Sequence, residues 1–378
     1  VNINATETVV LDGGSSEYRG DSELVTEIAS IVKRGAEGNA GGVTITTGSL
    51  EVKNGAGIST SIFSRGKAGT VNINAIDLEV NNGAQISSST SAKGDAGSVN
   101  INATGSLEVK SGANISTSVL ARGKGNAGSV NINATETVVI DGESSKYRGD
   151  SQSVTQVASN LDSGAEENAN AGSVTITTGS LEVKNGARIS SSIFSRGKAG
   201  TVDINATDLE VENGARISSS TYAKGDAGGV TITTGSLEVE NGAQISASTF
   251  AKGDAGIVNI NATETVVLDG GSSEYPGNSE LVTEVSSIVK QGAEGNAGGV
   301  TIVTESLEVK NGANISASSL PKSTGNGGDI SIDSTQVTLT DDSAIAVSSL
   351  GQGNGGNIFL STGDLFLDRD SRVSAVTA

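Results

Sequence analysis

The sequence predicts an all-β fold in which one continuous parallel β-helix, a solenoid of about 12 coils, runs along the whole chain. Three observations support it. A block of about 28 residues recurs throughout, apolar and polar residues alternate within each block, and Gly or Asn stands at fixed places between the apolar segments. A period of this size is typical of repeat proteins, in which each unit buries its apolar side only against its neighbours.

The repeat is easiest to follow at the first residue of a Val-x-Ile motif or of its Ile-containing variants. Successive occurrences are 28 residues apart in six of the eleven steps, and 30, 31, 42, 42 and 44 residues apart in the others. The motif begins at Val1, Val43, Val71, Val99, Val130, Val174, Val202, Val230, Val258, Val300, Ile330 and Ile358.

Each block contains three short segments with the two-residue alternation of a half-buried strand. In block 71–98 they are Val-Asn-Ile-Asn-Ala, then Leu-Glu-Val, then Ala-Gln-Ile-Ser-Ser-Ser. β-Branched residues dominate the apolar positions, which favours strands over helices. We therefore expect three short strands per coil, with Val71 lying over Val43 and under Val99.

Turn residues separate these strands. Asn82-Gly83 lies between the second and third strands, and Gly-rich turns such as Gly94-Asp95-Ala96-Gly97 close each block. Asn and Gly tolerate the left-handed backbone region. Asn-Gly is also the preferred turn of a β-hairpin, but hairpins within a block would leave no reason for the block to recur.

The three longest blocks divide the chain into super-repeats 1–129, 130–257 and 258–378. In each long block the extra residues follow the second strand, so we expect insertion loops over about 12–27, 141–156 and 269–284. A resumed third strand near Ile28 is favoured over a helical turn from Ser22. The chain does not begin with Met, and we expect it to be a segment of a longer protein.

Composition excludes several classes of function. A net charge of −19 argues against nucleic acid as a partner, and no apolar run is long enough for membrane insertion. The chain contains neither Cys nor His, which removes thiol chemistry and the commonest general base and transition-metal ligand. We expect no cofactor.

Together, the Gly-rich turns, Val-Asn-Ile-Asn-Ala, Leu-Glu-Val-Lys-Asn-Gly-Ala and Ile-Ser-x-Ser resemble the repeat arrays of filamentous-haemagglutinin-like exoproteins. These bacterial proteins use two-partner secretion, and cyanobacterial members are the most similar. The resemblance covers the whole chain and implies a right-handed parallel β-helix, export across an outer membrane, and adhesion or matrix building. The family's amino-terminal secretion domain and Asn-Pro-Asn motif are absent; the two Pro are Pro276 and Pro321.

The insertion loops carry the first candidate site, because binding residues are often found on loops of a rigid scaffold. Two loops contain Arg-Gly-Asp, the tripeptide of integrin ligands, although any exposed turn can contain the same residues. The candidate adhesive residues are Tyr18, Arg19, Gly20, Asp21, Tyr147, Arg148, Gly149, Asp150 and Tyr275.

A row of carboxylates is the second candidate site. One Glu occupies the same outward position in many coils, and Lys often follows two residues later. Where Glu replaces that Lys, cation binding is more plausible, although a solvated acidic face is the simpler interpretation. The cation candidates are Glu210, Glu212, Glu238 and Glu240.

These observations favour a non-catalytic structural or adhesive rod at the outer cell surface, with other copies of the rod or surface glycans as partners. One alternative is a carbohydrate-binding module built on the insertion loops. A second is a polysaccharide-active enzyme, which would need a set of acid and base groups that interrupts the repeat. The coils are interchangeable instead.

Overall fold

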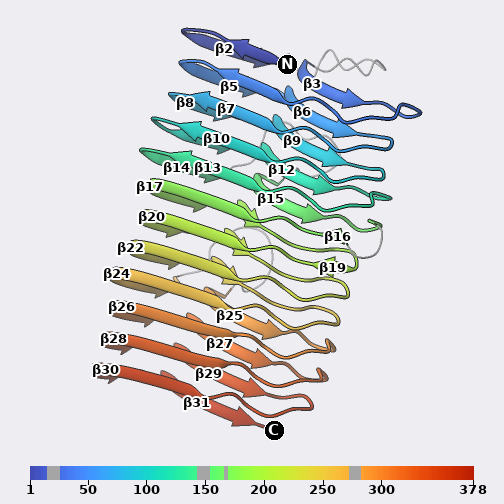
Figure 1. Ribbon diagram of the computed structural model, residues 1–378. Coiled ribbons are helices and arrows are strands. Elements are labelled where there is room, and N and C mark those ends of the chain that lie inside the picture. The colour runs from blue at the N-terminus through green and yellow to red at the C-terminus, as the bar shows by residue number, and fades with distance from the viewer. Residues whose placement is uncertain (15–25, 143–153, 166–168, 272–281) are drawn as a thin grey trace.

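The structure is a computed structural model that describes residues 1–14, 26–142, 154–165, 169–271 and 282–378. Over these ranges the chain forms a parallel β-solenoid with no helix, and its two termini lie at opposite ends of the stack (Figure 1). Each strand of the two large sheets pairs in parallel with its equivalent in the next coil, which confirms the predicted fold class and excludes hairpins within a block. We number the coils 1 to 12, each from its first strand to the end of its third turn.

Two sheets form the walls of the solenoid. The larger has 17 strands and contains the first and second segments of every coil. In coils 1 to 5 its first-segment strands are β1 Asn2–Asn4, β4 Val43–Thr46, β7 Val71–Ala75, β10 Val99–Ala103 and β13 Val130–Ala134. Its second-segment strands in the same coils are β2 Thr8–Asp12, β5 Ser49–Lys53, β8 Asp77–Val80, β11 Leu107–Lys110 and β14 Thr137–Asp141.

From coil 6 onward the first two segments join into one strand, so each of these coils contributes two strands to the two large sheets rather than the expected three. In the first of them, Thr178 and Leu181 are buried while the two residues between them are partly exposed. The alternation of inward and outward residues thus shifts by one residue. The strand bends at this point while it continues to pair with the strand of the next coil. The joined strands are β17 Val174–Lys184, β20 Val202–Val211, β22 Val230–Glu240, β24 Val258–Asp269, β26 Gly299–Lys310, β28 Asp329–Leu339 and β30 Ile358–Leu367.

The second sheet contains the third segment of every coil and has 12 strands in chain order. They are β3 Glu27–Val32, β6 Gly57–Ile62, β9 Gln85–Thr90, β12 Asn114–Val119, β15 Gln156–Leu161, β18 Arg188–Ser190, β21 Arg216–Ser218, β23 Gln244–Ser246, β25 Glu284–Val289, β27 Asn314–Ser319, β29 Ala344–Ser349 and β31 Arg372–Thr377. A two-residue pair, β16 Ala169–Asn170 and β19 Gly197–Lys198, lies in the third turns.

Like residues stack on like residues along the axis, as the repeat predicts. Val71 pairs with Val43 on one side and Val99 on the other, and all three side chains are fully buried. The inward Val, Ile, Leu and Ala side chains of successive coils form one continuous apolar core. This burial of equivalent residues stabilises each coil mainly through its two neighbours.

The turns explain two recurring residue types. Asn82 and Gly83 have φ angles of 49° and 72°, the left-handed region that Asn and Gly tolerate best. In the third turns the backbones of successive coils approach closely. A Cβ atom built on Gly200 would lie 2.1 Å from the carbonyl oxygen of Gly172, so no side chain fits there.

Outside the core, polar side chains also form ladders. The amide of Asn100 donates to Asn72 at 2.8 Å and accepts from Asn131 at 2.8 Å on the outer face of the large sheet. Inside, the Ser191 hydroxyl donates to the Gly172 carbonyl at 2.7 Å and accepts from the Gly200 N–H at 2.9 Å. Side-chain ladders of this kind stabilise stacked parallel strands.

Candidate functional site

The candidate adhesive residues of the insertion loops lie outside the described residues. This applies to Tyr18, Arg19, Gly20, Asp21, Tyr147, Arg148, Gly149, Asp150 and Tyr275. The structure describes the strands on either side: β2 ends at Asp12 and β3 begins at Glu27, for example. Each insertion therefore leaves the solenoid between the second and third segments of its coil.

The outward Glu residues of the second segment form an acidic column along the rod. Glu79 pairs in register with Glu51 and Glu108, and Glu210 pairs in register with Glu182 and Glu238. Val occupies this position in coils 1, 5 and 9, at Val10, Val139 and Val267. The acidic column is thus interrupted in the three coils that carry an insertion.

Lysines two residues further along neutralise part of the acidic column. Lys53 Nζ lies 2.7 Å from a Glu51 oxygen, and Lys184 Nζ lies 2.7 Å from a Glu182 oxygen. Side-chain hydrogen bonding to Glu182 is the main reason why the pKa of Lys184 is raised. These pairs are partly exposed, so solvent screening leaves each of them only a weak contribution to stability.

The four cation candidates lie beside one another where such lysines are missing. Burial, followed by repulsion from Glu212, raises the pKa of Glu210; burial, followed by repulsion from Glu238, raises the pKa of Glu240. Nevertheless, within the described ranges no three His, Cys, Asp or Glu side chains are arranged to hold a metal ion. Glu210 pairs in register with Glu238, and Glu212 and Glu240 lie two residues further along, so the four carboxylates form two neighbouring pairs rather than a coordination shell.

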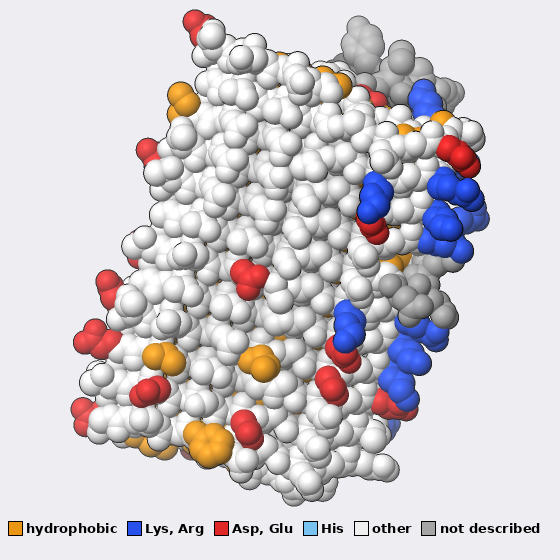
Figure 2. Space-filling model, viewed as in Figure 1, with side chains coloured by type: hydrophobic (Ala, Val, Ile, Leu, Met, Phe, Trp, Pro, Cys, Tyr) orange, Lys and Arg blue, Asp and Glu red, His pale blue; other side chains and the backbone are white. Residues whose placement is uncertain are grey.

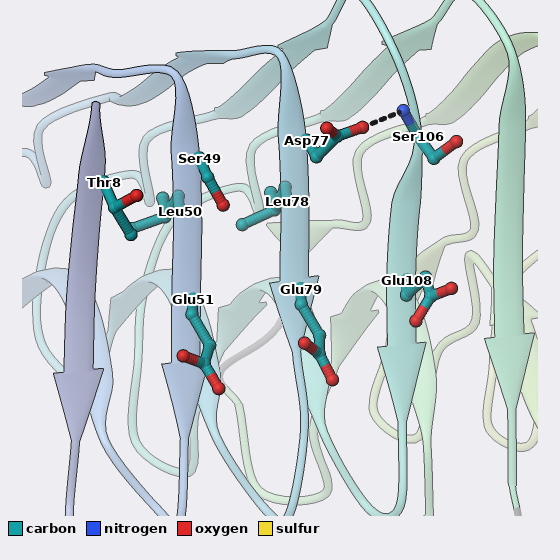
Figure 3. A pocket seen from close by; sticks show the side chains of 9 residues that line it. All are labelled: Thr8, Ser49, Leu50, Glu51, Asp77, Leu78, Glu79, Ser106 and Glu108. Carbon is teal, nitrogen blue, oxygen red and sulfur yellow. Dashed lines mark hydrogen bonds between the residues drawn. The ribbon is translucent and has the colours of Figure 1, made fainter. Parts of the chain in front are cut away.

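A shallow groove follows the acidic column over the first four coils. Its volume is about 280 Å³, and Thr8, Leu50, Leu78 and the residues of two rows line it. Figure 3 shows these rows: one has Ser49, Asp77 and Ser106, and the other has Glu51 and Glu79, whose carboxylates point the same way, and Glu108, whose carboxylate is turned to the side. Asp77 accepts a hydrogen bond from the Ser106 N–H at 3.0 Å. The groove presents stacked carboxylates to solvent.

An aromatic ladder is a feature that the sequence reasoning missed. Phe194, Tyr222 and Phe250 stack in successive coils, with ring centroids 4.7 and 4.4 Å apart, and each is 41–43% exposed. Lys290 Nζ lies 5.7 Å from the Phe250 centroid in the next coil. The signal was present in the sequence, because the three aromatics are 28 residues apart.

Comparison with protein families, curated proteins and solved structures found no match. Within the described ranges, no helix has the length and hydropathy needed to cross a membrane. The candidate surfaces are therefore interpreted from their own geometry.

Proposed function

We propose that this chain is a non-catalytic structural rod of a bacterial exoprotein, exposed at the outer cell surface or in an extracellular matrix. The rod spaces and displays the insertion loops and associates with further copies of itself. The exported location and the filamentous-haemagglutinin-like family rest on the resemblance of the repeats. Surface glycans are the partners that the carbohydrate-binding alternative would require.

The observation that carries this proposal is that the coils are interchangeable. The same residues pair in the same register from coil to coil, as Val71 does with both Val43 and Val99. The outward carboxylates follow the same repeat, whereas an enzyme needs a cluster of acid and base groups that differs from its surroundings. A repeating surface suits a spacer or an assembly unit.

The proposal can be tested by removing whole coils. Deleting residues 71–98 removes coil 3 and places Val99 on Val43, a pairing of like on like. Deleting 174–257 removes coils 6 to 8 and places Val258 on Val130. We expect both variants to keep the β-sheet circular dichroism spectrum. The rod should shorten by about 4.8 Å per coil in small-angle X-ray scattering. Global unfolding of both variants would contradict a modular rod.

A glycan array then separates the spacer from a binder. The full chain and a variant with short linkers in place of 14–26, 142–154 and 271–282 would be compared. A spacer role predicts no glycan signal from either protein. Signals that are lost with the insertions would instead favour the carbohydrate-binding alternative.

A further inference from the structure

Apart from the lysines that pair with the acidic column, many Lys and Arg side chains lie along one edge of the rod (Figure 2). Figure 2 shows them gathered on the side formed by the third turns, although the chain as a whole is strongly acidic. Within these turns one position forms a basic column. Its members are Arg65, Lys93 and Lys124 in coils 2 to 4, and Arg196, Lys224 and Lys252 in coils 6 to 8.

The same backbone hydrogen bond defines this column in successive coils. The Gly66 N–H bonds to the Lys93 carbonyl at 3.1 Å, and the Gly225 N–H bonds to the Lys252 carbonyl at 2.8 Å. In coils 1 and 9 the position holds an acid instead. Glu37 forms a parallel β-bridge with Arg65, and Glu294 forms one with Lys252. The basic column therefore has its own interruptions.

The basic and acidic columns are interrupted together in coils 1 and 9, whereas in coil 10 the acidic column has Glu308 and the basic position has Thr324. Both columns are charged in coils 2 to 4 and 6 to 8, where the acidic column has Glu51, Glu79, Glu108, Glu182, Glu210 and Glu238. In coil 1, Glu37 of the basic column accompanies Val10 of the acidic column, and in coil 9 Glu294 accompanies Val267. Because both columns belong to the same coils, their charges have the same spacing along the axis.

From this match we propose that the basic column of one rod docks on the acidic column of a second copy that lies parallel to it and at the same height. This inference deepens the proposed self-association by naming its two surfaces and its register. Each cation then faces a Glu of the partner rod in the same coil. The contact is heterologous, so a pair of rods keeps one free basic column and one free acidic column for further lateral growth.

The level register pairs all six cations with Glu and avoids like charges, whereas a shift of four coils, one super-repeat, avoids like charges but pairs at most four cations. If the partner moved by one coil in one direction, Glu37 would face Glu51 and Glu294 would face Glu308. One coil in the other direction, Glu294 would face Glu238. In the level register Glu37 and Glu294 face Val10 and Val267. Charge complementarity selects specific arrangements chiefly by penalising such repulsive ones.

Several of these charges have no ion-pair partner within the described part of the chain. In coil 7 neither Glu210 nor Lys224 forms an ion pair, and in coil 3 Glu79 and Lys93 do not either. The groove along Glu51, Glu79 and Glu108 gives the cationic side chains of the partner room to approach these carboxylates. A docked copy would supply the missing counter-charges.

Cross-linking tests the register, because the chain contains no Cys. The Lys224→Cys and Glu210→Cys variants both carry a thiol in coil 7. They are mixed at low salt and treated with a short bifunctional thiol reagent. We expect a cross-linked heterodimer that is lost at 1 M salt, where the Debye length falls to about 3 Å. The matched control is Lys224→Cys with Glu51→Cys, whose thiols lie five coils apart, a shift that would place Glu294 on Glu108, and which should not cross-link.

A complementation experiment tests whether the two columns are the surfaces in contact, by removing all the charges of one column in each of two variants. One variant carries Gln at the six cations of the basic column, and another carries Gln at the six Glu of the acidic column. By sedimentation velocity, neither should form the lateral contact alone, whereas an equal mixture should form one-to-one dimers. Three outcomes would each overturn the inference. They are cross-linking of the control cysteine pair, failure of the mixed Gln variants to form dimers, and a wild-type chain that stays monomeric at low salt. The coil deletions test the modular rod separately.

Discussion

The ring of Tyr222 lies on that of Phe250, with centroids 4.4 Å apart and planes inclined by 16°. Phe194 covers the other face of Tyr222 at 4.7 Å, so three coils are joined by aromatic contacts outside the apolar core. Offset aromatic pairs contribute about 0.5–1.5 kcal/mol each beyond the area they bury.

Substitution Tyr222→Ala removes both contacts of the ladder. We expect the free energy of unfolding to fall by about 1–3 kcal/mol, the sum of two such pairs, measured by chemical denaturation. Tyr222→Phe should retain the stability of the natural chain. Phe63→Ala is the matched control, since Phe63 has a similar exposure but no ring partner among the described residues. Equal losses for Tyr222→Ala and Phe63→Ala would contradict a contribution from stacking.

Substitution Gly200→Ala should force two coils apart, because the added Cβ would lie 2.1 Å from the Gly172 carbonyl oxygen. Overpacking of this kind costs about 1–3 kcal/mol, and here the obstacle is backbone that cannot rotate away. Gly41 occupies the same position in coil 1, where the nearest atom to a Cβ is the Ser30 hydroxyl at 3.4 Å. We expect Gly41→Ala to leave the melting temperature almost unchanged, and a similar loss from both substitutions would rule out this explanation.

The acidic column should make stability depend on pH. Because burial and neighbouring carboxylates raise the pKa of Glu210 above 4.5, ionisation of this group disfavours the folded state. Its destabilising effect is absent below pH 4, grows as pH rises through the raised pKa, and is complete above it. Glu210→Gln should therefore increase the free energy of unfolding at pH 7 by about 0.2–1 kcal/mol, which is measured as a higher melting temperature. At pH 3.5 the substitution should leave the melting temperature unchanged.

Glu182→Gln is the control for this pH effect. Glu182 is paired with Lys184 at 2.7 Å, so its removal breaks an ion pair, which offsets the repulsion that it relieves at Glu210. We expect no gain in stability at pH 7. Stabilisation by Glu182→Gln equal to that by Glu210→Gln would mean that overall net charge, rather than the local row, controls the effect.

The turn between the second and third strands gives a further prediction. Asn213 has a φ of 54°, where a residue with a β-branched side chain is strained. Asn213→Val should lower stability by about 1–2 kcal/mol, whereas Asn213→Gly should be nearly neutral. Thermal unfolding monitored by circular dichroism distinguishes the two, and equal melting temperatures would refute the backbone argument.

Much of this architecture was predictable because its determinants are local and repeated. The alternation around Val71 and Ile73 specifies which side chains face inward, and the period of the motif specifies that Val71 lies between Val43 and Val99. Asn82-Gly83 marks a left-handed turn through the backbone preferences of those two residues. None of these features depends on the distance between side chains in different coils.

The features that depend on such distances required the tertiary structure. The corner between Thr178 and Leu181 joins two predicted strands because stacking keeps the ladder intact through the bend. Likewise, the contact of Tyr222 with its neighbours and the crowding around Glu210 depend on how closely equivalent side chains approach from coil to coil. A linear pattern states which residues recur, but coil spacing and the path of the turns decide which of them touch.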